Sequence, residues 1–242
     1  MIDIIIPIYN EGYQVIKLLK LFEKKIKNNF SVYLCYDSVS DNIFNYITEL
    51  NKFKFKIVLL KNIESGPCCA VKTGLLNSQA NCKIVYPADD FINLDLLDLM
   101  YKVYLEHNAD IVVASRFVKG GSMVGCPFIK SILVRIASST LYFFSSIPVK
   151  DASNGFRLFS KKLLEKVKIE SKLGFAYSLE LLVKCNRLNM KILEVPAQWE
   201  ERSVGESNFK IFKWLNEYIK WYVYGLQTFW LKKKYPINIK NN

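Results

Sequence analysis

The sequence contains a single histidine, and its six cysteines include no Cys-x-x-Cys pair. A zinc site of ordinary ligand spacing and a disulfide framework are therefore both disfavoured, and scattered thiols are typical of the reducing cytosol. No apolar run reaches the about 20 residues that a membrane-spanning helix needs. The N-terminal segment has no basic region and meets Pro7 and Glu11 too early for a signal peptide. We therefore expect a cytoplasmic protein without a membrane span.

Acidic residues are scarce relative to basic ones. The 34 lysines and arginines against 22 aspartates and glutamates give a formal charge of +12. This surplus favours anionic partners such as nucleic acid, phosphorylated small molecules or an acidic membrane face, although a lysine-rich composition alone explains it equally well. With 242 residues, 51% of them hydrophobic, the chain is able to bury the core of one α/β domain, so a disordered class is excluded.

Short apolar runs alternate with segments of helical apolar spacing along the first half of the chain. The expected strands are residues 2–8, 31–36, 56–60, 83–86 and 111–114, and the expected helices are residues 15–27, 42–50, 70–76 and 94–106. This alternation predicts βαβ units and a mainly parallel sheet flanked by helices. In the less regular second half, helices are expected at 131–146, 161–167, 178–186 and 209–231, and strands at 155–159 and 192–195.

Polar side chains follow several of these strands at their carboxyl ends, where open sheets of this class bind ligands. They are Tyr9-Asn10-Glu11, Asp37, Asp89-Asp90 and Ser115-Arg116. The hard carboxylate oxygens of Asp89 and Asp90 suit Mg²⁺ or Mn²⁺, which usually bridge to substrate phosphates. Taken alone, the pair is explained more simply as the start of a helix, where aspartate is favoured.

Five motifs follow one another in the order found in a known family. They are Ile-Ile-Ile-Pro-Ile-Tyr-Asn-Glu at 4–11, a glycine-type segment at 66–74, Pro87-Ala88-Asp89, Ser115-Arg116-Phe117 with residues 151–157, and Trp199 with an R-x-x-G-x-S loop at 202–207. They resemble the family 2, GT-A-type glycosyltransferases, and the later ones resemble the dolichol-phosphate (polyprenyl-phosphate) mannosyltransferase branch. The resemblance implies a GT-A, Rossmann-like α/β catalytic domain at 1–207. Beyond it, aromatic residues and lysines at helical spacing predict an amphipathic helical tail at 208–242.

The chain departs from the family pattern at two places. Tyr36-Asp37 replaces the paired aspartates that follow the second strand, so Asp37 is left as the acceptor for a base or ribose. Pro87 stands at the first aspartate position of the D-x-D motif, which leaves Asp89 as the matching metal ligand and Asp90 as its substitute.

The resemblance implies inverting transfer of mannose or another hexose from a nucleoside diphosphate sugar, with GDP-mannose favoured and a UDP-sugar as the alternative donor. The residues implied to hold the nucleoside are Pro7, Tyr9, Glu11 and Asp37. Asp89 with Mg²⁺ or Mn²⁺ would hold the diphosphate, and Arg202 would close over it. The protein's own tasks would be in-line positioning and stabilisation of the leaving-group charge.

The resemblance also implies a polyprenyl phosphate acceptor, which arrives ionised and needs no general base. The implied acceptor residues are Arg116, Lys130, Arg135 and Asn154. Arg116 is favoured because a guanidinium binds phosphate through two parallel hydrogen bonds. Its alternative role is a salt bridge at a strand end, and that of Asn154 is a structural turn. An acceptor hydroxyl on a glycan or glycolipid would instead need a base, for which Asp151 is the candidate.

Aromatic residues and lysines are interleaved in the tail at 208–242. Such a segment suits the lipid headgroup region, and predicts a peripheral protein at the inner face of the membrane. The alternative is a helix packed on the catalytic domain with a solvated basic face. A nucleic-acid-binding protein ranks last and no nucleic-acid partner is expected, because Asp37, Asp89 and Asp90 would repel a phosphate backbone.

Overall fold

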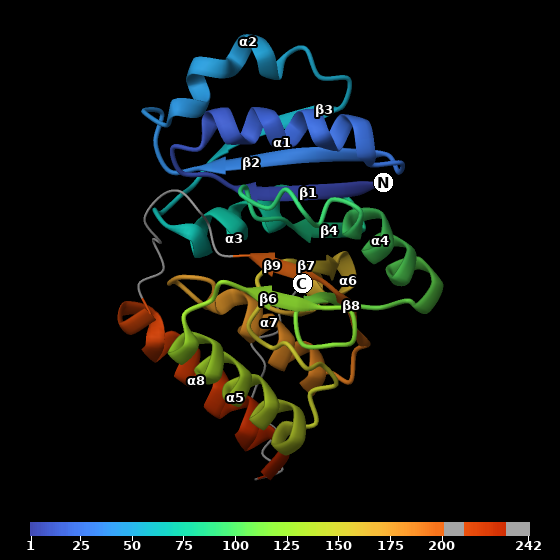
Figure 1. The fold of residues 1–242 in the computed structure, drawn as a ribbon, viewed down its shortest axis with the longest axis vertical. Helices are drawn as coiled ribbons and strands as arrows, with labels where there is room; N and C mark the ends of the chain where they lie inside the picture. The colour runs from blue at the N-terminus through green and yellow to red at the C-terminus, as the bar shows by residue number, and fades with distance from the viewer. Residues whose placement is uncertain (201–210, 231–242) are drawn as a thin grey trace.

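A seven-stranded sheet forms the centre of the structure, a computed structural model that describes residues 1–200 and 211–230 (Figure 1). The spatial order of its strands is β3-β2-β1-β4-β7-β5-β8. In chain order these are β1 (Ile2–Pro7), β2 (Phe30–Tyr36), β3 (Lys56–Lys61), β4 (Cys82–Val85), β5 (Ile111–Ser115), β7 (Arg157–Ser160) and β8 (Ile192–Pro196). Residues 2–6 of β1 are all buried, as expected for an apolar strand that is covered on both faces.

All strands of this sheet run in one direction except β7, which is antiparallel to its neighbours β4 and β5. The carboxyl ends of the parallel strands therefore meet at one edge of the sheet. Because β7 runs the other way, its first residue, Arg157, lies at that same edge, opposite Val85 of β4 and Val113 of β5. The loop before β7 thus joins the loops that follow β1, β2, β4 and β5.

Helices cover both faces of the sheet (Figure 1). One face is packed by α1 (Gly12–Lys25), η1 (Asn42–Tyr46), α2 (Ile47–Leu50) and α4 (Leu96–His107). The other face is packed by α3 (Pro67–Asn77), α6 (Lys161–Lys166) and α7 (Ala176–Arg187), with α5 (Phe128–Ser145) and α8 (Ile211–Trp230) joining this layer. Helix α1 forms because its apolar residues recur three or four positions apart and its last turn carries Lys24 and Lys25, which complement the helix dipole.

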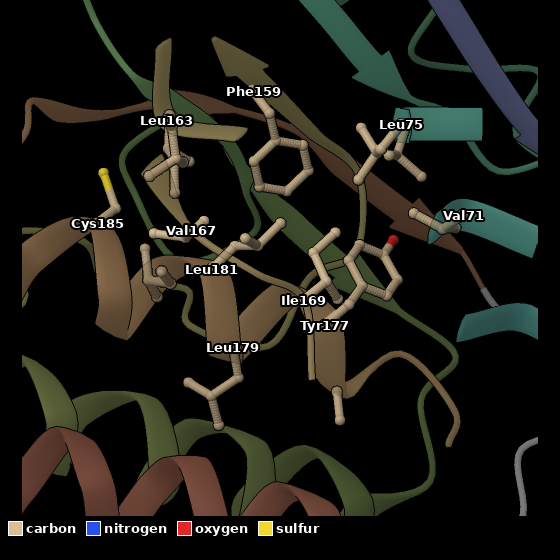
Figure 2. Packing of buried hydrophobic residues seen from close by; sticks show 14 of the residues in the cluster. Val71, Leu75, Phe159, Leu163, Val167, Ile169, Tyr177, Leu179, Leu181 and Cys185 are labelled. Carbon is tan, nitrogen blue, oxygen red and sulfur yellow. The ribbon is translucent and has the colours of Figure 1, made fainter. Parts of the chain in front are cut away.

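The core on the α7 side fills the space between β7 and the helices (Figure 2). Phe159 of β7 and Leu181 of α7 are fully buried there, as is Tyr177 near the start of α7. Interiors of this kind are close-packed, so the elements that contribute these side chains hold fixed positions relative to one another. The loop that precedes β7 is therefore anchored to α7 as well as to the sheet.

Helix α8 packs along one face against α5 and α7. Trp221 is 2% exposed, and its Nε1 donates to Ser171 Oγ at 2.8 Å. A Cβ atom at Gly225 would lie 3.1 Å from Val183 and 3.2 Å from Leu141, so a glycine there permits the close approach of the three helices. Residues 211–230 are therefore part of the packed body, and a domain boundary at residue 207 stays a prediction.

The expected α/β architecture, mainly parallel sheet and C-terminal helix are confirmed. Two short strands, β6 (Ser122–Val124) and β9 (Gln198–Glu200), were not expected from the sequence, and they pair in parallel as a separate sheet. At three residues each they are too short for a pattern of alternation. Within residues 1–200 and 211–230, no helix is long and apolar enough to cross a membrane.

Candidate active site

The loop after β1 carries Tyr9 and Glu11 and is pinned by the segment after β2. Asn10, in the left-handed region at a φ of 56°, donates its N–H to Asp41 Oδ2 at 2.8 Å. Asn42 donates through Nδ2 to the Asn10 carbonyl oxygen at 2.9 Å. These bonds leave Tyr9 exposed at the carboxyl edge of the sheet, with 63% of its surface accessible. An exposed aromatic side chain in a fixed loop is well suited to contact a nucleoside.

Asp37 directly follows β2, and both of its carboxylate oxygens accept hydrogen bonds. Asn62 Nδ2 donates to Oδ1 at 2.7 Å, and the N–H of Gly66 donates to Oδ2 at 3.0 Å. Gly66 is the N-cap of α3 and has a φ of 109°, a conformation that favours glycine. Each carboxylate oxygen has a second lone pair. Asp37 is thus oriented by its neighbours and retains the capacity to accept from a ligand.

Asp89 and Asp90 follow β4 at the same edge, but Asp90 is committed to a turn. Its Oδ1 accepts from the N–H groups of Ile92 and Asn93, both at 2.9 Å, and its Oδ2 accepts from Asn93 Nδ2 at 2.7 Å. Asn93 in turn exchanges two hydrogen bonds with the backbone of Gln198 in β9. Burial raises the pKa of Asp90. The Asp90 oxygens thus orient Asn93, which links the β4 loop to β9, and a metal-ligand role of Asp90 stays a prediction.

Asp89 would be the protein ligand of a divalent cation at this edge. Across the described ranges, 1–200 and 211–230, no group of three or more His, Cys, Asp or Glu side chains is placed to hold a metal ion. Mg²⁺ is commonly held by one or two carboxylates together with substrate phosphates and water, so a single half-buried carboxylate suffices when a diphosphate is bound. The ion would supply positive charge that offsets the charge of a departing diphosphate.

Arg116, directly after β5, is paired with the fully buried Asp151. Its Nε donates to Asp151 Oδ2 at 2.7 Å, and its Nη2 donates to Asp151 Oδ1 at 2.9 Å and to Ser153 Oγ at 2.6 Å. The strand-end salt bridge is therefore present. The Nε–Nη2 edge is used in this way, and Nη1 donates one of its two N–H groups to the sulfur of Met123 at 3.6 Å. The second N–H of Nη1 is the one that remains for an anionic ligand.

Arg135 of α5 brings a second guanidinium to the same place. Its Cζ lies 4.6 Å from the centre of the Phe117 ring, and the Cζ of Arg116 lies 5.2 Å from the same ring. Both guanidiniums therefore lie beside the Phe117 ring. Binding of an acceptor by Arg116 and Arg135 stays a prediction.

Asn154 supports the loop before β7 from both ends of its amide. Its Nδ2 donates to the carbonyl oxygen of Ala114 at 2.6 Å, and its Oδ1 accepts from the N–H of Phe156 at 3.1 Å. These are the contacts of a structural turn. Direct contact of Asn154 with an acceptor stays a prediction.

The side chains of two expected site residues lie outside the described part of the chain. Arg202 lies outside the described residues, and the side chain of Lys130, within α5, is also outside them. Sequence reasoning in turn missed Asp41, Asn42 and Asn93, which orient the site loops. The available signal was local: Asp41 precedes a helical turn and caps η1 by accepting from Ile43 N, as an aspartate before a helix commonly does.

Comparison with known sequences identifies the family. Residues 3–168 match the sequence pattern of glycosyl transferase family 2. The chain belongs to this family. The loops described above lie at the carboxyl edge of the sheet, where open sheets of this class bind ligands.

Three curated relatives of this family 2 chain carry names that refer to dolichol or polyprenol phosphates. A dolichol-phosphate mannosyltransferase of Pyrococcus furiosus is 26% identical over 88% of this chain and 61% of the relative. A polyprenol monophosphomannose synthase of Mycolicibacterium smegmatis is 25% identical over 46% of each chain. A dolichyl-phosphate beta-glucosyltransferase of Trichomonas vaginalis is 26% identical over 83% of this chain and 66% of the relative. The chain thus spans less than two thirds of the length of each relative.

Solved structures show the same fold. Glucosyl-3-phosphoglycerate synthase of Mycobacterium tuberculosis, in complex with phosphoglyceric acid, superposes with a TM-score of 0.67 at 14% identity, over 93% of this chain and 80% of that chain. The complex of that enzyme with Mn²⁺, UDP-glucose and phosphoglyceric acid gives a TM-score of 0.64 at 14% identity, over 94% and 79%. At this identity the likeness establishes the fold alone.

Proposed function

We propose that this family 2 glycosyltransferase moves a hexose, with inversion, from a nucleoside diphosphate sugar to a polyprenyl-phosphate acceptor at a membrane surface. The names of the curated relatives support a lipid phosphate as the acceptor. Two of the three names specify mannose, which supports GDP-mannose as the first donor to test, with UDP-glucose second. A nucleic-acid-binding role is not carried further, because the family is one of transferases.

The observation that carries the proposal is the state of Asp151. This carboxylate is fully buried, and three hydrogen bonds from Arg116 reach it. Burial alone would raise its pKa, but the hydrogen bonds and charge of Arg116 outweigh burial and hold the pKa below the ordinary value. A carboxylate in this state does not take a proton from an acceptor hydroxyl. The arrangement therefore favours an acceptor that is already an anion.

The residues divide the work between donor and acceptor. Pro7, Tyr9, Glu11 and Asp37 contact the nucleoside, and Asp89 contacts the diphosphate. Arg116 and Arg135 hold the acceptor phosphate, so that one of its oxygens faces the anomeric carbon opposite the leaving diphosphate. A bond forms between that oxygen and the anomeric carbon as the bond to the diphosphate breaks. Lys130 and Arg202 belong to the same scheme on sequence grounds, as second acceptor cation and as clamp on the diphosphate.

A peripheral position at the inner face of the membrane is supported by α5 and α8, which lie side by side (Figure 1). Large apolar side chains on these two helices are exposed: Phe128, Ile132, Leu133, Ile136, Tyr142, Phe143 and Phe144 on α5, and Leu215, Ile219, Val223 and Trp230 on α8. Helix α5 also carries Lys130 and Arg135 and no acidic residue. An apolar face with basic residues suits an anionic lipid surface.

The second candidate function is transfer to a hydroxyl of a glycan or glycolipid, which the family fold also accommodates. A screen separates the two: transfer and hydrolysis are measured with GDP-, UDP- and dTDP-sugars, with Mg²⁺ or Mn²⁺, with and without a short polyprenyl phosphate. We expect a glycosyl phosphate product that requires the polyprenyl phosphate. Turnover of a donor only when a sugar or glycolipid hydroxyl is supplied would refute the proposal.

A further inference from the structure

We propose that Arg157 is a positioning residue, which holds residues 151–154 in the shape that presents Asp151 to Arg116. It thereby sets which edge of the Arg116 guanidinium faces an acceptor. The structural part of this inference concerns Asp151 and Arg116 alone, and only the last step rests on the proposed acceptor phosphate.

Arg157 is fully buried, and all three of its guanidinium nitrogens donate to backbone carbonyl oxygens. Nε donates to Asn154 O and Nη2 to Ala152 O, both at 2.7 Å, and Nη1 donates to Ser178 O at 2.5 Å. Burial lowers the pKa of Arg157 to about 10, so the side chain keeps its charge at neutral pH. A buried cation whose nitrogens are committed in this way is costly to move, because each bond it loses leaves a polar group unsatisfied.

The carbonyl of Ala152 shares its peptide plane with the N–H of Ser153, so the bond from Arg157 to Ala152 O fixes the direction of the Ser153 N–H. The bond to Asn154 O holds the far side of the same turn. While the two carbonyls point to Arg157, the N–H groups of Ser153 and Asn154 each donate to Asp151 Oδ1 at 3.2 Å. The loop therefore wraps Arg157 on one side and the Asp151 carboxylate on the other. Asp151 in turn fixes the Nε–Nη2 edge of Arg116.

Other contacts also hold the loop, within it and at its ends. Inside it, the N–H of Ala152 donates to Ser138 Oγ at 3.3 Å and Asn154 Nδ2 donates to Ala114 O at 2.6 Å, whereas Arg157 binds the carbonyl oxygens of Ala152 and Asn154. The N–H of Lys150 donates to Glu194 Oε2 at 2.8 Å, before the loop begins. The hydroxyl of Tyr177 donates to Gly155 O at 3.2 Å, after it. Because Ser178 belongs to the first turn of α7, Arg157 also ties the loop to the packed core of Figure 2.

The first test is structural and needs no substrate. In ¹⁵N-arginine-labelled protein, the Arg116 Nε–H signal is assigned by its loss in Arg116→Lys, and its hydrogen exchange is measured. Arg157→Lys keeps the charge but replaces the planar fork by a point donor, so we expect at least about tenfold faster exchange at Arg116. Unchanged exchange at Arg116 in Arg157→Lys would overturn the inference, whatever the acceptor is.

The matched control is Lys83→Met. Lys83 is also a buried cation, 4% exposed, whose Nζ donates to the carbonyls of Leu75 and Ser78, but it lies at the opposite end of β4. We expect a lower melting temperature in both variants and faster Arg116 exchange only in Arg157→Lys. Equal exchange effects in the two variants would make the role of Arg157 one of general stability and refute positioning.

The second test is a double-mutant cycle on steady-state kinetics, with citronellyl phosphate as acceptor. Arg157→Lys should raise the acceptor KM by about tenfold or more and change the donor KM by less than about twofold. If Arg157 acts through Asp151, Asp151→Asn/Arg157→Lys should match Asp151→Asn alone, whereas multiplied losses would contradict the inference. Absence of transfer by the wild-type enzyme would count against the proposed function, and the exchange measurement would still decide the role of Arg157.

Discussion

For Asp151 and Asp90, the roles expected from the sequence contrast with the hydrogen bonds that the structure shows. The sequence motifs predict Asp90 as a substitute metal ligand, and Asp151 as the base if the acceptor is a hydroxyl. In the structure, both carboxylates are buried or half-buried and accept hydrogen bonds from neighbouring loops. The sequence predicts that these residues lie at the sheet edge that carries the site. It does not predict where their carboxylate oxygens point, because that depends on contacts with residues elsewhere in the chain.

The state of Asp151 predicts how stability depends on pH. Its folded-state pKa is depressed, mainly by Arg116, so the pair stabilises the protein at pH values above the unfolded pKa of about 3.9. That contribution is lost as the pH falls through the folded pKa. We therefore expect the difference in unfolding free energy between wild type and Asp151→Asn to shrink below about pH 4. Urea unfolding at a series of pH values measures it, and a difference that grows on acidification would contradict this account of Asp151.

Asp89 and Asp90 should respond differently to the same substitution. Asp89→Asn should lower transfer at least about 100-fold, because a neutral amide is a poor ligand for a hard cation beside a diphosphate. Asp90→Asn should lower the melting temperature by a few degrees, since both Asp90 oxygens anchor the loop to Asn93. Full activity of Asp89→Asn, or of the wild type in excess EDTA, would remove the metal role.

At the scale of elements, the apolar patterns of the sequence predict nearly every strand of the main sheet and nearly every helix that flanks it. Residues 42–50 are an exception in detail, because they form the 3₁₀ helix η1 followed by a single turn of α2. The antiparallel direction of β7 and the pairing of β6 with β9 could not be predicted, because the residue pattern of a strand of three or four residues carries no information about its direction or partner. The antiparallel direction of β7 places its first residue, Arg157, at the edge of the sheet that carries the site.

Helices α5 and α8 each have a packed face and an exposed face. Substitutions on the exposed face should weaken membrane binding, and substitutions on the packed face should lower stability. Replacing Phe143 and Ile136, which are 71% and 56% exposed, by glutamine should lower partitioning onto anionic vesicles by about tenfold or more with little change in melting temperature. Leu105→Gln on α4, where the side chain is 55% exposed, is the matched control and should bind as the wild type does. Co-sedimentation with vesicles measures the binding.

A substitution on the buried face of α8 should lower stability. Trp221→Ala should cost about 3–5 kcal/mol of stability, because it removes a fully buried ring and the hydrogen bond to Ser171. Chemical denaturation measures the loss. Wild-type stability in Trp221→Ala, or wild-type vesicle binding in the Phe143 and Ile136 variant, would show that the two faces of these helices are assigned wrongly. Lysines 232–234 lie outside the described residues, and their part in binding stays a prediction.

At the scale of the whole molecule, donor and acceptor groups come from different parts of one sheet edge. The loops after β1 and β2 carry Tyr9 and Asp37, and the loop after β5 carries Arg116 beside α5. A donor bound at one end and a lipid phosphate delivered along α5 would meet near Asp89. The central claim is therefore that the acceptor is a phosphate and needs no general base.

The most direct measurement compares two acceptors that differ only in this group. The purified enzyme, its best donor and Mg²⁺ are incubated with citronellyl phosphate or with citronellol, and product formation is followed by ³¹P NMR and mass spectrometry. Our account predicts a glycosyl phosphodiester from the phosphate and no glycoside from the alcohol, with the phosphate reaction falling in Arg116→Lys. A glycoside formed from the alcohol at a comparable rate would contradict the account.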